Sequence, residues 1–273
     1  MEEKALIPYL IDTHCHLDAA EFDLDRDALV AAAKVGAGRT ALMVIPAVER
    51  ANFGAVASVC REYPGCAPAY GIHPMYVDRA RPDDLDALRE TLRRELAVAV
   101  GEIGLDRHIE PRDEALQDFY FVEQLKIACE FDLPVLLHVR KAIDPILKLL
   151  RQARVSGGIV HAFNGSREQA DAFIKLGFKL GFGGAMTYPG SKRIRELASG
   201  LPLESIVLET DAPDIPPAWK SGGRNTPADL VPIAETLAEL RSLSLAEVAT
   251  ATSHNAFAAL PRLKQFITTG ELQ

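Results

Sequence analysis

Short β-rich runs alternate with longer stretches of helical spacing along the whole chain, and this alternation constrains the fold more than any other feature. The runs are rich in residues typical of buried strands, and each is followed by apolar residues at helical spacing. Eight runs are expected to form strands, at 7–11, 40–45, 67–71, 97–100, 135–137, 158–160, 178–182 and 206–208. Repeated strand–helix units of this kind predict parallel strands in an α/β fold.

The stretches between the runs predict helices. They are expected near 25–33, 51–63, 84–95, 112–131, 142–154, 168–176, 191–198, 227–240 and 245–259. In the helix over 112–131, Leu116, Phe119 and Tyr120 are expected to face inward. Ser244 followed by Glu247 predicts a capping box at the start of the last helix.

Two architectures accommodate eight such units: an eight-stranded barrel and an open doubly wound sheet. The first run is not followed by a Gly-x-Gly-x-x-Gly phosphate loop, which argues against a dinucleotide-binding sheet. Single α/β barrels often reach the length of this chain, 273 residues, and no linker or low-complexity tract divides it. The sequence therefore predicts a single-domain (β/α)8 TIM barrel over residues 1–273.

Composition bears on location and partners. The formal net charge is −8, whereas proteins that coat long stretches of nucleic acid are normally basic. The four cysteines form no CxxC pair, which is typical of reduced thiols in a cytoplasmic protein. We expect no signal peptide and no membrane contact, because no apolar run approaches about 18 residues. No feature indicates a stable protein partner, and we expect a monomer.

Two histidines follow the first run. In an extended segment, residues i and i+2 point to the same side, so His14 and His16 are expected to aim at one point. Imidazole binds metals readily, and such a pair at the open end of a barrel is suited to a metal site. The alternative for this pair alone is two histidines with separate structural partners.

Metal-ligating residue types also follow four other runs, and in a barrel all of these ends converge on one mouth. The candidate ligands are His14, His16, Glu102, His138, His161 and Asp211. Six ligands exceed the needs of one tetrahedral zinc but suit two divalent ions. Two such ions can activate water and stabilise charge on an attacked phosphoryl or carbonyl oxygen.

Two of these residues have expected catalytic roles. Glu102 is the natural bridge between the ions, since its two oxygens can reach both. Asp211 is expected to bind one ion and accept a proton from the attacking water. Imidazole-rich ligation favours Zn, Mn, Fe, Co or Ni, with Mg as a further alternative.

Six motifs in fixed order, covering nearly the whole chain, resemble those of the TatD-type metal-dependent deoxyribonucleases of the amidohydrolase superfamily, closest to the YjjV-like branch. They are DTHCHLD at 12–18, GIHP at 71–74, GEIGLD at 101–106, LHVR at 137–140, HAFNGS at 161–166 and LETDAP at 208–213. The resemblance implies a barrel that hydrolyses phosphodiester bonds in DNA, with the same six residues as ligands of divalent metals. Related members have also been assigned deacylase activity on mischarged tRNA.

The chain departs from the family pattern at two places. Val139 replaces a usual Ser or Thr after the fifth-strand histidine, so a hydroxyl contact is absent there. Ala162 and Asn164 stand where Cys-Phe-Ser or Gly-Phe-Ser is usual. Neither departure affects a metal ligand, so the resemblance still implies the metal site, but it does not carry over the family's substrate contacts near the phosphate.

Two further residues are candidates for substrate binding. His73 follows the third run and is expected either to hydrogen-bond a phosphate or to fix a turn beside Pro74. Arg140 is expected either to pair with an anionic substrate or to form a surface salt bridge.

Three hypotheses for function follow. The leading one is a cytoplasmic DNA exonuclease that cleaves phosphodiester bonds with a metal-activated water. The second is a metal-dependent hydrolase of amide, ester or aminoacyl bonds, such as a D-aminoacyl-tRNA deacylase. The third is a barrel that binds metal without turnover.

Overall fold

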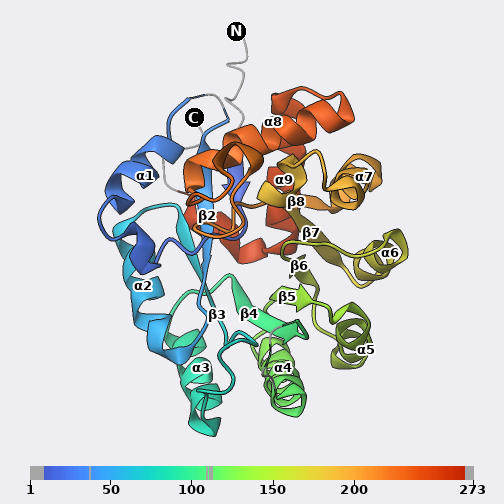
Figure 1. Ribbon diagram of the computed structural model, residues 1–273. Coiled ribbons are helices and arrows are strands. Elements are labelled where there is room, and N and C mark those ends of the chain that lie inside the picture. The colour runs from blue at the N-terminus through green and yellow to red at the C-terminus, as the bar shows by residue number, and fades with distance from the viewer. Residues whose placement is uncertain (1–8, 37, 109, 111–112, 268–273) are drawn as a thin grey trace, which may run out of the picture.

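The computed structural model describes residues 9–36, 38–108, 110 and 113–267. Eight parallel strands in the order β1-β2-β3-β4-β5-β6-β7-β8 form one sheet that curves into a barrel with helices around it (Figure 1). The predicted (β/α)8 barrel is confirmed. The strands are β1 Leu10–Asp12, β2 Thr40–Pro46, β3 Cys66–Tyr70, β4 Ala99–Asp106, β5 Val135–Arg140, β6 Gly158–Val160, β7 Phe178–Phe182 and β8 Ile206–Leu208.

Each strand leads through a helix to the next parallel strand, as right-handed β/α units require. The helices are α1 Arg26–Ala33, α2 Phe53–Glu62, α3 Pro82–Arg94, α4 Glu114–Glu130, α5 Ile143–Ala153, α6 Arg167–Lys175, α7 Lys192–Gly200, α8 Leu230–Arg241 and α9 Leu245–Ala259. The expected capping box begins α9, where Ser244 and Glu247 bond reciprocally. No helix in the described ranges combines the length and apolarity needed to cross a bilayer.

The strands are buried on both faces, which is why they read as nearly continuous apolar runs. Along β2, Leu42 and Val44 belong to an inner cluster of apolar side chains, while Met43 and Ile45 pack outward beneath the helices. Leu260, just after α9, joins the inner cluster. The barrel interior is therefore filled, and chemistry is confined to the end where the strands finish.

Hydrogen bonds close the barrel between its first and last strands. The Thr13 amide donates to the Leu208 carbonyl at 3.0 Å. Buried Asp12 accepts from the Thr210 amide at 3.0 Å and from the Thr210 hydroxyl at 2.6 Å. No β-ladder joins β8 to β1 in the part of the chain that the structure describes, so these side-chain and loop contacts make the closure.

Some expected boundaries differ from the structure. The first strand was expected over 7–11, but β1 runs to Asp12, and residues 7 and 8 lie outside the described ranges. β4 was expected to end at residue 100 but continues to Asp106, so it passes through two glycines that resemble a turn. Phe119 is 47% exposed, contrary to expectation, and Phe121 is buried instead.

Candidate metal centre

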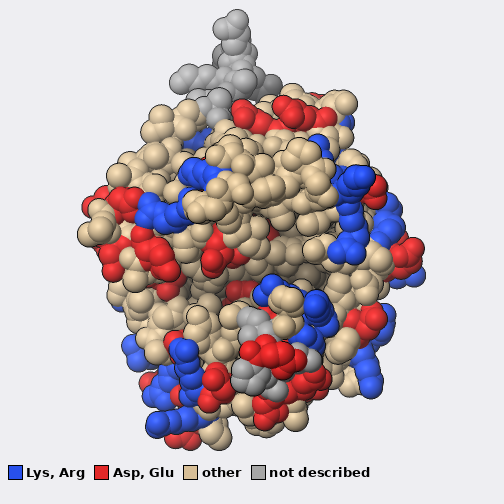
Figure 2. All heavy atoms as spheres, in the orientation of Figure 1, with Lys and Arg blue, Asp and Glu red and all other residues tan. Residues whose placement is uncertain are grey.

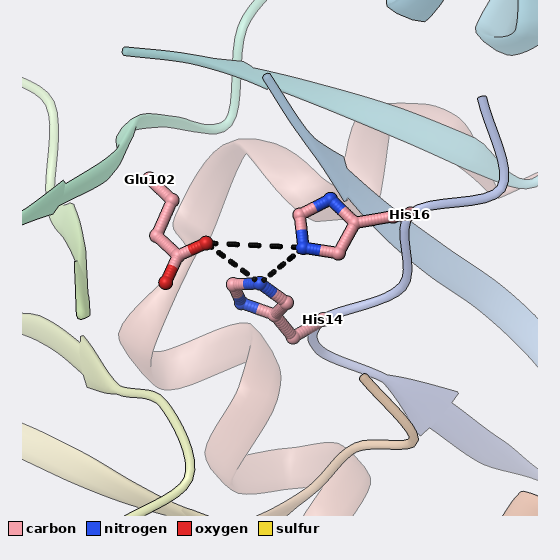
Figure 3. A group of neighbouring side chains, drawn as sticks. All are labelled: His14, His16 and Glu102. Atoms are coloured by element: carbon pink, nitrogen blue, oxygen red, sulfur yellow. Dashed lines mark hydrogen bonds and ion pairs between the residues drawn. The ribbon is translucent and has the colours of Figure 1, made fainter. Parts of the chain in front are cut away.

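The loop after β1 brings two imidazoles to one point. His14 Nε2 lies 3.3 Å from His16 Nε2 and 3.2 Å from Glu102 Oε2, and the three side chains face one another (Figure 3). Both histidines lie just past the strand, where the His16 amide donates to the Ala212 carbonyl at 2.8 Å. The two imidazoles therefore share a carboxylate rather than having separate structural partners.

Glu102 occupies the centre of the group, in the middle of β4. Its Oε2 faces His14, and its Oε1 lies 3.1 Å from His138 Nδ1 on the adjacent strand β5. Parallel pairing of β4 with β5 sets this distance, because Gly104 stands opposite His138 in the ladder. The two carboxylate oxygens thus face different imidazoles, which is the arrangement expected of a bridging ligand.

Asp211 completes the group from the loop after β8. Its Oδ1 lies 3.6 Å from His161 Nε2, 3.7 Å from His16 Nε2 and 3.8 Å from His14 Nε2. The His14 and His161 rings stack with their centroids 3.8 Å apart. The structure therefore brings all six predicted ligands together at the barrel mouth.

The donor set suits divalent cations. Three groups within the described residues have ligand atoms within 4.8 Å of one another. They are His14, His16 and Glu102; His14, His161 and Asp211; and His73, Glu102 and His138. Imidazole nitrogens and carboxylate oxygens that converge in this way, with His14 and Glu102 fully buried, are the chemistry of a divalent metal site.

Burial and charge set the protonation of the group. Burial lowers the pKa of His14 to about 4, so its ring is neutral at neutral pH and offers a lone pair. Although burial opposes it, neighbouring Glu209 and Asp211 raise the pKa of His161 to about 10. The carboxylates therefore attract a positive charge to this end of the mouth, and a bound cation would supply it in place of that proton.

His73 lies at the same mouth with its tautomer determined by the backbone. The Met75 amide donates to His73 Nδ1 at 3.1 Å, so in the neutral ring the proton is on Nε2. That nitrogen lies 3.5 Å from Glu102 Oε1. Of the two expected roles, the structure shows the turn contact at Nδ1, while Nε2 faces the Glu102 carboxylate at the mouth.

Two buried carboxylates that the sequence predictions did not assign as site residues orient the imidazoles. Glu209 Oε1 lies 3.1 Å from His161 Nδ1 and accepts from the Ala162 amide at 2.6 Å. Asp106 Oδ2 lies 3.1 Å from His138 Nε2. Asp106 ends β4, four residues after Glu102, and Glu209 follows β8, two residues before Asp211. This short spacing from a candidate ligand is the signal by which the sequence could have identified them. Carboxylates in this position fix the ring orientation of ligating histidines.

Replacing Glu209 by glutamine is expected to weaken metal binding by about 10- to 100-fold, because His161 loses the carboxylate that orients it. Calorimetric titration of metal-depleted protein with Mn²⁺ measures this directly. Glu196→Gln, at an exposed position on α7, removes the same charge outside the site and is expected to bind Mn²⁺ like the unmodified protein. Equal affinity of the Glu209 variant and the control would contradict the assigned role.

The ligands lie in a cavity of about 1020 Å³ at the barrel mouth. Figure 2 shows this face hollowed near its centre, with Lys and Arg atoms on part of the rim. The cations that line the cavity are Arg140, Lys141 and Arg193. Arg140 is exposed and has no salt bridge to another described residue, so the surface ion pair, one of its two expected roles, is not formed there.

Comparisons with known proteins agree with this geometry. Residues 11–261 match the model of the TatD-related DNase family. The chain is 39% identical to the uncharacterized metal-dependent hydrolase YjjV of Escherichia coli K12, over 92% of this chain and 98% of that protein. The crystal structure of YjjV superposes with a TM-score of 0.88, at 36% identity and over 92% and 98% of the two chains.

Two further relatives match at lower sequence identity. The uncharacterized metal-dependent hydrolase YabD of Bacillus subtilis is 33% identical, over 90% of this chain and 97% of that protein. A putative deoxyribonuclease of the mouse is 30% identical, over 94% and 90%. The family match spans nearly all of the described residues and includes every candidate ligand. The chain belongs to the TatD family of metal-dependent hydrolases.

Proposed function

We propose that this hydrolase cleaves phosphodiester bonds in DNA and removes nucleotides from strand ends. The observation that carries the proposal is a buried group of imidazoles and carboxylates in a cavity whose wall presents Arg140, Lys141 and Arg193. Cations beside a metal site are suited to a substrate with phosphate groups. The names of the TatD-related DNase family and of the putative deoxyribonuclease of the mouse point to the same substrate.

Two carboxylates have different tasks in this reaction. Although burial opposes it, nearby His73 and His14 hold the pKa of Glu102 well below its usual range, so Glu102 stays ionised. Burial raises the pKa of Asp211 to about 6, which suits a group that takes a proton near neutral pH. A divalent cation held by these residues would supply positive charge for the phosphoryl oxygens and make water more acidic. Asp211 then accepts the proton of the attacking water.

The depth of the site favours strand ends. The ligands lie inside the cavity, and the net charge of −8 gives weak attraction to long stretches of nucleic acid. A flexible single-stranded end can enter the mouth without a basic face along the duplex. We therefore infer an exonuclease that acts on single-stranded ends.

The assay uses a single-stranded oligonucleotide labelled at either end, with Mg²⁺, Mn²⁺ or Zn²⁺ added to metal-depleted protein. We expect mononucleotide release with at least one metal, and a loss of at least about 100-fold in His138→Ala prepared in parallel. Equal release by the variant would indicate a contaminating nuclease and contradict the mechanism. Bound metal without hydrolysis of any substrate would favour the metal-binding barrel.

In a second candidate function, the same site hydrolyses an aminoacyl ester or amide bond instead of a phosphodiester. Asp144 and Asp214 are exposed and line the same cavity, where they can receive the ammonium group of an aminoacyl ester or amide. A polarised carbonyl would then be attacked, as in a D-aminoacyl-tRNA deacylase. The test assays aminoacyl esters and the oligonucleotide at the same metal concentration. The nuclease is expected to hydrolyse only the oligonucleotide, and the deacylase only the aminoacyl esters.

A further inference from the structure

An arginine on the cavity wall is held by a side chain that departs from the family pattern. Arg193 is the second residue of α7, and Asn164 lies in the loop between His161 and α6. The Arg193 Nε and Nη2 groups both donate to Asn164 Oδ1, at 3.2 Å and 2.6 Å. Both residues line the cavity that contains His161 and Asp211. The pair therefore joins α7 to the loop that carries a candidate metal ligand.

Asn164 orients the guanidinium without neutralising it. An amide oxygen is an uncharged acceptor, and no carboxylate among the described residues lies within salt-bridge distance of Arg193. Nearby Arg167, on α6, differs in this respect because its Nε lies 3.1 Å from Asp171 Oδ1. Arg193 is exposed, and its two hydrogen bonds to Asn164 orient the guanidinium while leaving its charge uncompensated and other N–H donors unused.

The chemistry of this donor group favours a phosphate. A guanidinium presents parallel N–H groups that match two oxygens of one phosphate, and pre-orientation reduces the conformational entropy that binding costs. Arg193 reaches the cavity from α7, whereas the candidate ligands stand on or just after β1, β4, β5, β6 and β8. The guanidinium and the candidate ligands thus approach the same cavity from different elements, which suits a substrate with two neighbouring phosphates.

We propose that Arg193, positioned by Asn164, binds a second phosphate of the substrate, next to the phosphodiester that is cleaved. This inference rests on the proposed function and deepens it, because it makes a terminal phosphate beside the scissile bond a determinant of specificity. The preferred short substrate is then a dinucleotide that carries an additional phosphate. Asn164, which departs from the family pattern, sets this preference because it orients Arg193.

The hydrolytic test compares the dinucleotide dTpdT with pdTpdT and dTpdTp, which carry an additional 5′ or 3′ phosphate. We expect the unmodified protein to prefer one phosphorylated form in kcat/KM by roughly 10- to 100-fold, the range for one charged hydrogen-bonded contact. Arg193→Gln is expected to abolish the preference. Asn164→Asp is expected to do the same with Arg193 still present, because a carboxylate would neutralise the guanidinium.

Control variants separate this role from general charge and from folding. Lys192→Gln removes a charge from an exposed neighbour on α7 that does not line the cavity, and is expected to keep the full preference. Arg193→Lys is expected to restore part of it, because an ammonium keeps the charge but loses the paired geometry. The circular dichroism spectrum of Arg193→Gln shows whether that variant is folded, and unchanged kcat/KM for dTpdT in Lys192→Gln shows that a charge removed from α7 outside the cavity leaves the reaction intact.

A binding measurement separates failure of this inference from failure of the proposed function. Thymidine 3′,5′-bisphosphate has two phosphates and no diester bond, and calorimetry compares its affinity with those of the 3′- and 5′-monophosphates. We expect the unmodified protein to bind the bisphosphate more tightly than either monophosphate, and Arg193→Gln to bind it about 10-fold or more weakly. Equal binding by the two proteins would overturn the inference. If only hydrolysis is absent, the proposed function fails and the Arg193 phosphate site stands.

Discussion

Glu102→Gln is expected to reduce hydrolysis by at least about 100-fold, which exceeds the usual effect of changing a residue that only orients a ligand. Glutamine keeps the shape of the side chain but removes the charge that faces His14 at 3.2 Å and His138 at 3.1 Å. An amide binds divalent cations far less well than a carboxylate, and only one of its two terminal atoms can serve as a ligand. Metal retained per chain, measured by elemental analysis of protein purified without added metal, is expected to fall in parallel.

Glu95→Gln is a matched control, since this residue lies at the C-terminal end of α3, outside the candidate centre and its cavity. The control is expected to keep both metal and activity. Full metal content and unchanged turnover in Glu102→Gln would refute the assignment of Glu102 as the bridging ligand. Full metal content with lost turnover would place its role in the reaction rather than in binding.

Gly104→Ala is expected to destabilise the protein by more than about 4 kcal/mol, which is exceptional for one methyl group. Gly104 has a φ of +152°, and a Cβ at this position would lie 1.9 Å from the His138 carbonyl oxygen. That oxygen belongs to the backbone of the neighbouring strand, so relief would require β4 and β5 to separate. Denaturant unfolding followed by circular dichroism measures the change, and loss of folded protein is its extreme form.

Gly54→Ala gives the contrasting result. Gly54 lies in α2, where an added Cβ meets no atom within 4 Å. Alanine has the higher helix propensity, so this variant is expected to gain about 0.5–1 kcal/mol. If Gly104→Ala unfolded at the same denaturant concentration as Gly54→Ala, the close approach of β4 to His138 would be excluded.

The fold and the ligand set could be predicted from the sequence because their signals are local or repeated. Each strand is a short apolar run, and the ligands stand at or just beyond the ends of such runs. Topology then converts position along the chain into proximity, since parallel barrel strands all finish at one mouth. His14 and Asp211 are far apart in sequence, yet their predicted proximity required only the order of the strands.

What could not be predicted depends on pairing between distant segments. Glu209 was visible beside Asp211, but its contact with His161 depends on the register of β6, β7 and β8. Gly101 and Gly104 resemble a turn, and only the pairing of β4 with β5 shows that they continue a strand. Phe119 and Phe121 are close neighbours on α4, a helix without a distinct apolar stripe, so the pattern could not decide which ring faces inward.

Closure of the barrel at Asp12 and Thr210 has a consequence for folding. These residues are 198 positions apart, and the Asp211 amide donates to the His14 carbonyl across the same seam. Contacts between residues so far apart in sequence have a large entropic cost of loop closure, and they slow the folding of a chain. A cation held by both His14 and Asp211 binds only the closed chain, so its binding free energy adds to the stability of the barrel. Assembly of the reaction centre and joining of the two ends of the sheet are thus thermodynamically coupled.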